Sequence, residues 1–283
     1  MKSLLQLLKE ELDARSAANQ LQAAFKSDTV SGFVSKFKQI ASDPKVQAIL
    51  KAGRTDNAPN DEILKYTEKV LPVKDLIPTQ NEIGFDQSIM TLLTDEFGSL
   101  GSILDGDANV GGPIVTYKGK YIIDGHHRWS QVFAGNPNAK MKAIDLEGNL
   151  KPTEMLKVVH AAIASRVGEV PSANPKGINI LKGVKYDEVL NKAKENLTPK
   201  AEDVWSDHGI NSTEDIARHI FNHLSQLIRA NKPIPGAPGR KDMPQTDAAK
   251  SPAADKLNLL KKGMVNFRDP KPTDAKSTVH SKD

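Results

Sequence analysis

The chain has 283 residues, 38% of them hydrophobic, which is enough to bury a core but low for a chain that is folded throughout. It contains no cysteine, so disulfide bonds, thiolate nucleophiles and cysteine-ligated zinc sites are excluded. Of the net charge of +4, residues 231–283 carry +5, from 11 Lys and Arg against 6 Asp and Glu, and the other residues carry −1. The charge of those other residues therefore does not indicate nucleic-acid binding.

Residues 1–70 have the spacing of helices. Asp43 before Pro44 is a typical helix start, and a further short helix is expected over residues 61–70. Apolar residues recur at helical spacing in two runs, which are Leu4, Leu5, Leu8 and Leu12, and then Phe33, Val34, Phe37 and Ile40.

The leucine-rich start does not have the sequence pattern of a targeting segment. Its apolar run is short, acidic residues follow at once, and no cleavage site of small residues appears. No apolar run in the chain reaches the roughly 20 residues that a membrane-spanning helix needs. We therefore expect a soluble, cytoplasmic protein without a membrane partner.

Residues 71–148 combine strand and helix patterns. Residues 71–78 alternate like an edge strand bounded by prolines, and the runs at 114–117 and 121–123 predict a β-hairpin. The glycines between residues 106 and 112 match neither common nucleotide-binding fingerprint and predict a loop. Helices are expected over residues 88–97 and 125–135, and a closing strand over residues 141–146.

Residues 149–230 return to helical spacing, with helices expected over residues 153–167, 185–196 and 213–228. Residues 231–283 are rich in proline and basic residues and predict a disordered tail. Within it, the amphiphilic segment Leu257 to Phe267 can dock on a partner protein, and its lysines can contact DNA. The fold class expected is α+β, with a small mixed sheet between two helical regions.

One motif points to chemistry, and it lies between the hairpin and the next helix. A strand ends at Asp124, Gly125 permits a tight turn, and a helix begins with its unpaired N–H groups and positive dipole end. Phosphates bind at such helix starts. Arg128 can add a fork of donors, while His126 and His127 can transfer protons near neutral pH. Asp124 can orient a histidine, hold a metal ion or cap the helix.

Structural interpretations of the same residues stay open. Asp-Gly is a common turn, and Asp is a common helix cap. Adjacent histidines on a helix point about 100° apart, so His126 and His127 cannot share one role. Trp129 is expected in the core rather than as a platform on which bases stack.

The order of these elements over roughly residues 70–148, with the Asp-Gly-His-His-Arg turn before the last helix, resembles the ParB/sulfiredoxin superfamily. In ParB proteins the corresponding turn reads Gly-Glu-Arg-Arg and contacts nucleotide phosphates. In sulfiredoxin it reads Gly-Gly-Cys-His-Arg, and the cysteine attacks a sulfinic acid. Here His126 replaces that cysteine, which excludes sulfiredoxin activity, and only Arg128 matches the ParB turn, so DNA clamping is not implied.

By motif, the chain is most similar to ParB-like proteins with Asp-Gly-His-x-Arg, among them free-serine kinases and proteins labelled ParB-like nucleases. The resemblance implies phosphate binding by Gly125, His126, His127 and Arg128, with ATP or another nucleotide and Mg²⁺ as cofactors. It also implies that Glu82, in the loop after the first strand, acts as a base. Asp124 and His126 are further catalytic candidates because of the chemistry of their own side chains. A solvated loop acid is the structural alternative for Glu82.

Three functions stay open at this point. The chain can be a nucleotide-dependent enzyme of phosphoryl transfer or phosphoester hydrolysis. It can be a non-catalytic nucleotide- or DNA-binding module that acts through partners of its tail. It can also be a structural or packaged protein, for example of a bacteriophage, that keeps the fold without the catalysis.

A weaker signal lies near residue 220. His219 and His223 have a spacing that can bind a metal ion, but they sit at the edge of an apolar helix face. No glutamate stands between them as in a ligand motif, so we expect a packing role.

Overall fold

The computed structural model describes residues 3–53, 66–175 and 177–245. The chain divides into two compact units, each assembled from segments that are far apart in the sequence. The first comprises Met1–Tyr66, Glu147–Ala173 and Asp242–Asp283, and the second comprises Thr67–Leu146 and Asn174–Lys241. Within the described ranges, no helix combines the length and apolar character that a membrane crossing requires.

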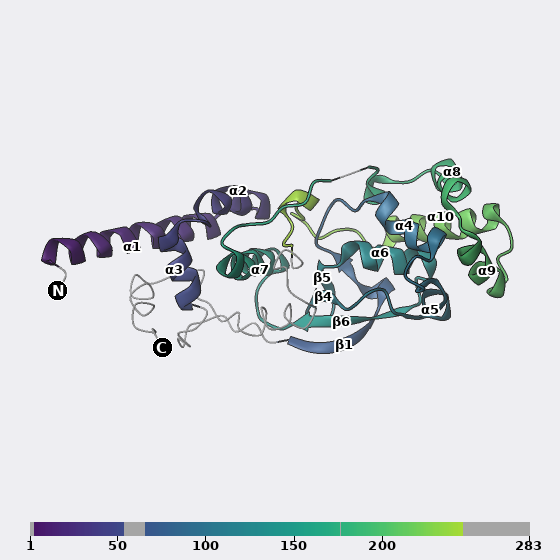
Figure 1. Cartoon of the computed structure of the whole chain (residues 1–283), viewed down its shortest axis with the longest axis horizontal. Coiled ribbons are helices and arrows are strands. Elements are labelled where there is room, and N and C mark those ends of the chain that lie inside the picture. Colours follow the sequence, from purple (N-terminus) through teal and green to yellow (C-terminus); the bar gives the residue numbers. More distant parts are fainter. Residues whose placement is uncertain (1–2, 54–65, 176, 246–283) are drawn as a thin grey trace. The chain divides into compact units, whose positions relative to one another are not determined.

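The first unit is helical, as the spacing of its apolar residues predicts. Ser3 and Gln6 form a capping box at its first helix, and the Asp43 carboxylate accepts the Lys45 N–H at 2.8 Å at the start of its third. Its helices are α1 (Leu4–Phe25), α2 (Val30–Ile40), α3 (Pro44–Gly53) and α7 (Pro152–Val167), and α1 and α2 lie side by side (Figure 1).

A buried lysine ties α7 to the end of α1. The Lys157 ammonium donates to the Phe25 and Ser27 carbonyls at 3.1 and 2.7 Å and forms an ion pair with Glu154 at 2.8 Å. The Phe25 and Phe33 rings, 4.8 Å apart, pack nearby in the core. Carbonyls at a helix C-terminus have no donor within the helix, and here the lysine ammonium supplies the missing donor.

The second unit is built around a mixed six-stranded sheet in the order β1-β6-β4-β5-β2, with β3 also paired to β6. β4 and β5 form the predicted hairpin, and its turn residues Lys118 and Gly119 have φ of 55° and 63°. The strands are β1 (Tyr66–Pro72), β2 (Ile77–Pro78), β3 (Asp107–Ala108), β4 (Ile114–Tyr117), β5 (Tyr121–Asp124) and β6 (Lys140–Leu146).

Two buried tryptophans fix helices of this unit. The Trp129 indole donates to the Val73 carbonyl at 2.8 Å, and the Trp205 indole donates to the Leu92 carbonyl at 2.9 Å, so Trp129 is a core residue as expected.

Two helices of this unit, α4 (Phe85–Thr94) and α6 (His126–Gly135), pack on each other next to the sheet (Figure 1). The helices are η1 (Val73–Asp75), α4 (Phe85–Thr94), α5 (Leu100–Asp105), α6 (His126–Gly135), η2 (Ile180–Lys182), α8 (Tyr186–Asn196), α9 (Pro199–Asp207), α10 (Thr213–Ala230) and η3 (Arg240–Asp242).

Several sequence predictions need correction. Residues 66–70, expected in a helix, belong to the edge strand β1, because pairing with β6 overrides local helix preference. The single strand expected over residues 71–78 is interrupted by η1. α4 begins and ends three residues earlier than expected, which leaves the Phe97 side chain 73% exposed. Residues 54–65 lie outside the described residues.

Asp145 on β6 is buried, and both of its carboxylate oxygens accept hydrogen bonds. Its carboxylate accepts from the Thr116 hydroxyl at 2.8 Å, from the Gly119 N–H at 2.6 Å and from the Lys69 ammonium at 2.6 Å. Asp145 therefore links β6 to β4, to the turn of the β4–β5 hairpin and to β1. This hairpin leads into the candidate site.

We expect Asp145→Ala to lower the free energy of unfolding by about 2–4 kcal/mol, since the Thr116 hydroxyl and the Gly119 N–H lose their acceptor. Urea denaturation measures this change. Lys142→Ala, at an exposed position of the same strand, is the control and should change stability by less than about 0.5 kcal/mol. Equal effects of the two substitutions would contradict the role of Asp145.

Candidate functional site

The turn between β5 and α6 requires glycine. Gly125 has a φ of 89°, and a Cβ added to it would lie 2.5 Å from the Cγ2 of Ile114. The Asp124 carboxylate closes the turn by accepting the Gly125 N–H at 2.8 Å. The predicted strand, tight turn and helix start are therefore confirmed, and Asp124 is placed as a turn-closing residue.

The first turn of α6 leaves backbone donors available. Within the described part of the chain, the N–H groups of His126, His127 and Arg128 have no acceptor. The residues around them, Gly125 included, are half-buried rather than enclosed, except for the His126 side chain. These donors and the positive end of the helix dipole suit an anion.

The two histidines hold the loop that follows β2. Nε2 of His126 accepts the Thr79 N–H at 3.2 Å, and Nε2 of His127 accepts the Gly84 N–H at 3.2 Å. Both ends of the loop of residues 79–84 are thus attached to the start of α6. The loop carries Glu82, so the segment that contains the predicted base is attached to the helix that follows the predicted phosphate turn.

Burial keeps both imidazoles neutral. Burial, together with the nearby His127, lowers the pKa of His126 to about 3, and its side chain is only 4% exposed. Burial also lowers the pKa of His127 to about 4, with a smaller contribution from the positive charge of Arg240. Since a protonated ring nitrogen cannot accept a hydrogen bond, these low pKa values preserve the attachment of the loop.

Arg128 is oriented by the loop that precedes β4. Its Nη1 donates to the Gly112 carbonyl at 2.8 Å and to the Pro113 carbonyl at 2.9 Å. Burial lowers the pKa of this guanidinium, while the negative charge of Asp124 raises it. This glycine-containing segment, expected only to form a loop, thus supplies two carbonyl oxygens to the arginine.

Residues 231–241, expected to open the disordered tail, instead pack along residues 74–87, which include the loop of residues 79–84. The N–H and the side-chain amide of Asn81 donate to the Pro238 and Ala237 carbonyls at 2.9 and 2.8 Å. Proline lacks an N–H but keeps a strong carbonyl acceptor, so a proline-rich segment can pack by accepting hydrogen bonds. We name residues 234–240 the strap. Residues 246–283, including Leu257 to Phe267, lie outside the described residues.

The strap brings a second arginine to the site, which the sequence did not identify. The Arg240 N–H donates to Oε2 of Glu82 at 3.2 Å, and its Nη1 donates to Oε1 of Gln87 at 2.8 Å. No local pattern marks Arg240, because its position follows from contacts with residues more than 150 positions away. Glu82 is therefore a bonded residue of the site, half-buried, and not a free loop acid.

A metal ion at this site would depend on the ligand for part of its coordination. Among the described residues, no group of three or more His, Asp or Glu side chains gathers as a metal site would require. Asp124 and Glu82 supply carboxylates, and Mg²⁺ is often held by one or two carboxylates together with substrate phosphates and water.

Comparisons with protein-family models, with curated proteins and with solved structures returned no match.

We expect the loop attachment to be acid-sensitive. The folded-state pKa values of about 3 for His126 and about 4 for His127 lie below the unfolded value of 6.5, so the unfolded chain takes up protons first. Stability should be complete above pH 6.5 and fall toward pH 4, by up to about 1.4 kcal/mol per pH unit for each ring.

Urea denaturation between pH 7.5 and pH 4.5 tests this sensitivity. In the double variant His126→Gln, His127→Gln, the amide oxygen can still accept a hydrogen bond but does not titrate. Its stability should fall less steeply with acid than that of the wild type. An unchanged slope would show that these two rings do not cause the acid sensitivity.

Proposed function

We propose that the start of α6 binds the phosphate groups of a nucleotide, and that the chain is a ParB/sulfiredoxin-like protein of phosphoryl transfer or phosphoester hydrolysis. The observation that carries the proposal is the set of three backbone N–H groups at residues 126–128 without an acceptor among the described residues. Two guanidinium groups accompany them, Arg128 within the same helical turn and Arg240 from the strap.

The proposal gives the histidines a positioning role. His126 and His127 use Nε2 to hold the loop of residues 79–84, and their low pKa values leave no proton on those atoms to donate. Phosphate would contact their backbone N–H groups, while Arg128 and Arg240 provide the positive side chains. This assignment replaces proton transfer by His126, which the sequence had led us to expect from the chemistry of the side chain.

Glu82 is the base in this proposal. Oε2 accepts the Arg240 N–H, which holds the carboxylate in place, and a carboxylate can take a proton from an acceptor hydroxyl. Mg²⁺ bound to the phosphates and to Asp124 or Glu82 would neutralise charge on the transferred group. Without such a cation the two carboxylates would repel a polyphosphate, so the carboxylates and the arginines together fit a nucleotide with Mg²⁺.

Phosphate binding is tested by calorimetric titration of the full chain with ATP, ADP and CTP, with and without Mg²⁺. Because a hydrogen bond to a charged group contributes about 1.5–3 kcal/mol, Arg128→Lys and Arg240→Ala should each weaken binding by about tenfold or more. Arg218→Ala, at an exposed position of α10, is the matched control and should bind as the wild type does. Failure of the wild type to bind any of the three nucleotides refutes the proposal.

Catalysis is tested separately with Glu82→Gln. The amide oxygen of glutamine can still accept the Arg240 N–H, so we expect nucleotide affinity to be kept while release of phosphate falls by about 100-fold or more. Asp86→Asn, an exposed carboxylate on α4, is the control and should keep the wild-type rate. Equal turnover by Glu82→Gln and wild type would remove Glu82 as the base. Binding without any turnover by the wild type would favour a non-catalytic nucleotide-binding module.

A further inference from the structure

An asparagine side chain holds the backbone on both sides of Glu82. Nδ2 of Asn179 donates to the Asn81 carbonyl at 2.9 Å, and Oδ1 of Asn179 accepts the Ile83 N–H at 3.1 Å. The carbonyl and the N–H belong to the two peptide units that flank the Cα of Glu82. One planar amide therefore fixes the piece of backbone from which the Glu82 side chain projects.

The orientation of this amide follows from its partners. Oδ1 of Asn179 also accepts the Leu181 N–H at 3.1 Å and so caps the start of η2. Two N–H groups thus meet Oδ1, and one carbonyl meets Nδ2. The reversed orientation would set the NH₂ group against both N–H donors, so the network fixes which atom faces Asn81.

The carboxylate of Glu82 has one oxygen held and one oxygen free. Oε2 accepts the Arg240 N–H at 3.2 Å, whereas Oε1 has no hydrogen-bond partner among the described residues. The side chain is half-buried. A general base must reach the proton that it abstracts, so the direction of the free oxygen depends on the backbone that Asn179 holds.

The segment that carries Asn179 stays attached to the loop without this side chain. The Phe85 N–H donates to the Ile178 carbonyl at 2.8 Å, and the Ile180 N–H donates to the Ile83 carbonyl at 2.9 Å. Because both bonds use main-chain groups, a substitution of Asn179 leaves them intact. Such a variant loses the clamp around Glu82 and keeps the segment in place.

We propose that Asn179 is a positioning residue for Glu82, needed for turnover and not for nucleotide binding. This role rests on the proposed function, in which Glu82 takes the proton of the acceptor hydroxyl. Within the described part of the chain, Asn179 forms no hydrogen bond with Arg128 or Arg240, and the Arg240 guanidinium is held by Gln87. The phosphate-binding groups should therefore stay in place when Asn179 is changed.

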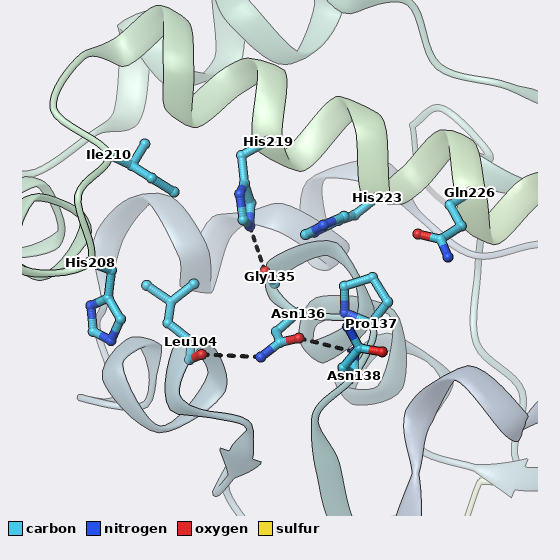
Figure 2. A pocket seen from close by; sticks show the side chains of 10 residues that line it. All are labelled: Leu104, Gly135, Asn136, Pro137, Asn138, His208, Ile210, His219, His223 and Gln226. Carbon is cyan, nitrogen blue, oxygen red and sulfur yellow. Dashed lines mark hydrogen bonds between the residues drawn. The ribbon is translucent and has the colours of Figure 1, made fainter.

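The other end of α6 offers a matched control. Nδ2 of Asn136 donates to the Leu104 carbonyl at 3.1 Å, and its Oδ1 accepts the Asn138 N–H at 3.0 Å, in the pocket that Figure 2 shows. Asn136 thus bridges backbone groups as Asn179 does, but at the C-terminal end of α6. Its substitution removes similar hydrogen bonds without touching the loop of Glu82.

The test measures phosphate release and nucleotide affinity of the full chain carrying Asn179→Ala, Asn179→Asp or Asn136→Ala. Asn179→Asp keeps Oδ1 as the acceptor for Ile83 and for the cap of η2, but it sets an oxygen against the Asn81 carbonyl. We expect kcat to fall by about tenfold or more in both Asn179 variants, since a misplaced base is inefficient. Asn179→Ala should bind nucleotide within about twofold of the wild type, and Asn136→Ala should keep both values.

A double-mutant cycle with Glu82→Gln separates positioning from a general loss of structure. If Asn179 acts through Glu82, adding Asn179→Ala to Glu82→Gln should lower the rate by less than about twofold. Three results overturn this role: wild-type kcat in Asn179→Ala, an equal fold-loss with and without Glu82→Gln, and a loss of nucleotide affinity as large as the loss of rate.

Failure of the proposed function gives a different result. It shows in the wild type as absent binding or absent turnover, or as wild-type turnover in Glu82→Gln, and each of these also removes the role of Asn179. Loss of turnover in Glu82→Gln together with the wild-type rate in both Asn179 variants overturns the role of Asn179 alone.

Discussion

The candidate site depends on two imidazoles that must stay uncharged. His126 and His127 attach the loop of residues 79–84 to α6 only while Nε2 of each ring can accept a hydrogen bond. Burial secures this by making the protonated forms unfavourable, with pKa values of about 3 and about 4. Asn81 and Glu82 of the same loop form hydrogen bonds with the strap. The position of Arg240 therefore depends indirectly on the two rings, which hold this loop.

Histidine serves both ends of α6, in opposite hydrogen-bonding roles. At the start of the helix, imidazoles accept from loop N–H groups and leave the helix's own donors available to an anion. At its end, the imidazoles of His219 and His223 donate to the last carbonyls. This arrangement follows the polarity of the helix, whose start favours negative ligands and whose end favours positive ones.

The sequence predicted features whose causes are local. The hairpin, the Gly125 turn and the helix after it follow from residues within a few positions of each other, and so does the core position of Trp129. The loop with Glu82 was placed beside the turn through the family resemblance. Three features could not be predicted, because each depends on a partner distant in the sequence. They are residues 66–70 of the edge strand β1, the roles of the two histidines, and the strap. The proline content of residues 231–241 in particular predicted disorder. Prolines, however, prevent only regular backbone hydrogen bonding, because they lack an N–H.

The strap's prolines also determine how it can be aligned. Pro235 and Pro238 have no N–H, so within this stretch only certain positions can donate, and the Ile234 N–H uses the Pro78 carbonyl. A shift of the strap by one residue in either direction would set a proline, Pro233 or Pro235, where that donor is needed. The prolines on either side of Ile234 therefore disfavour a shift by one residue, and the present alignment keeps Arg240 in contact with Glu82 and Gln87.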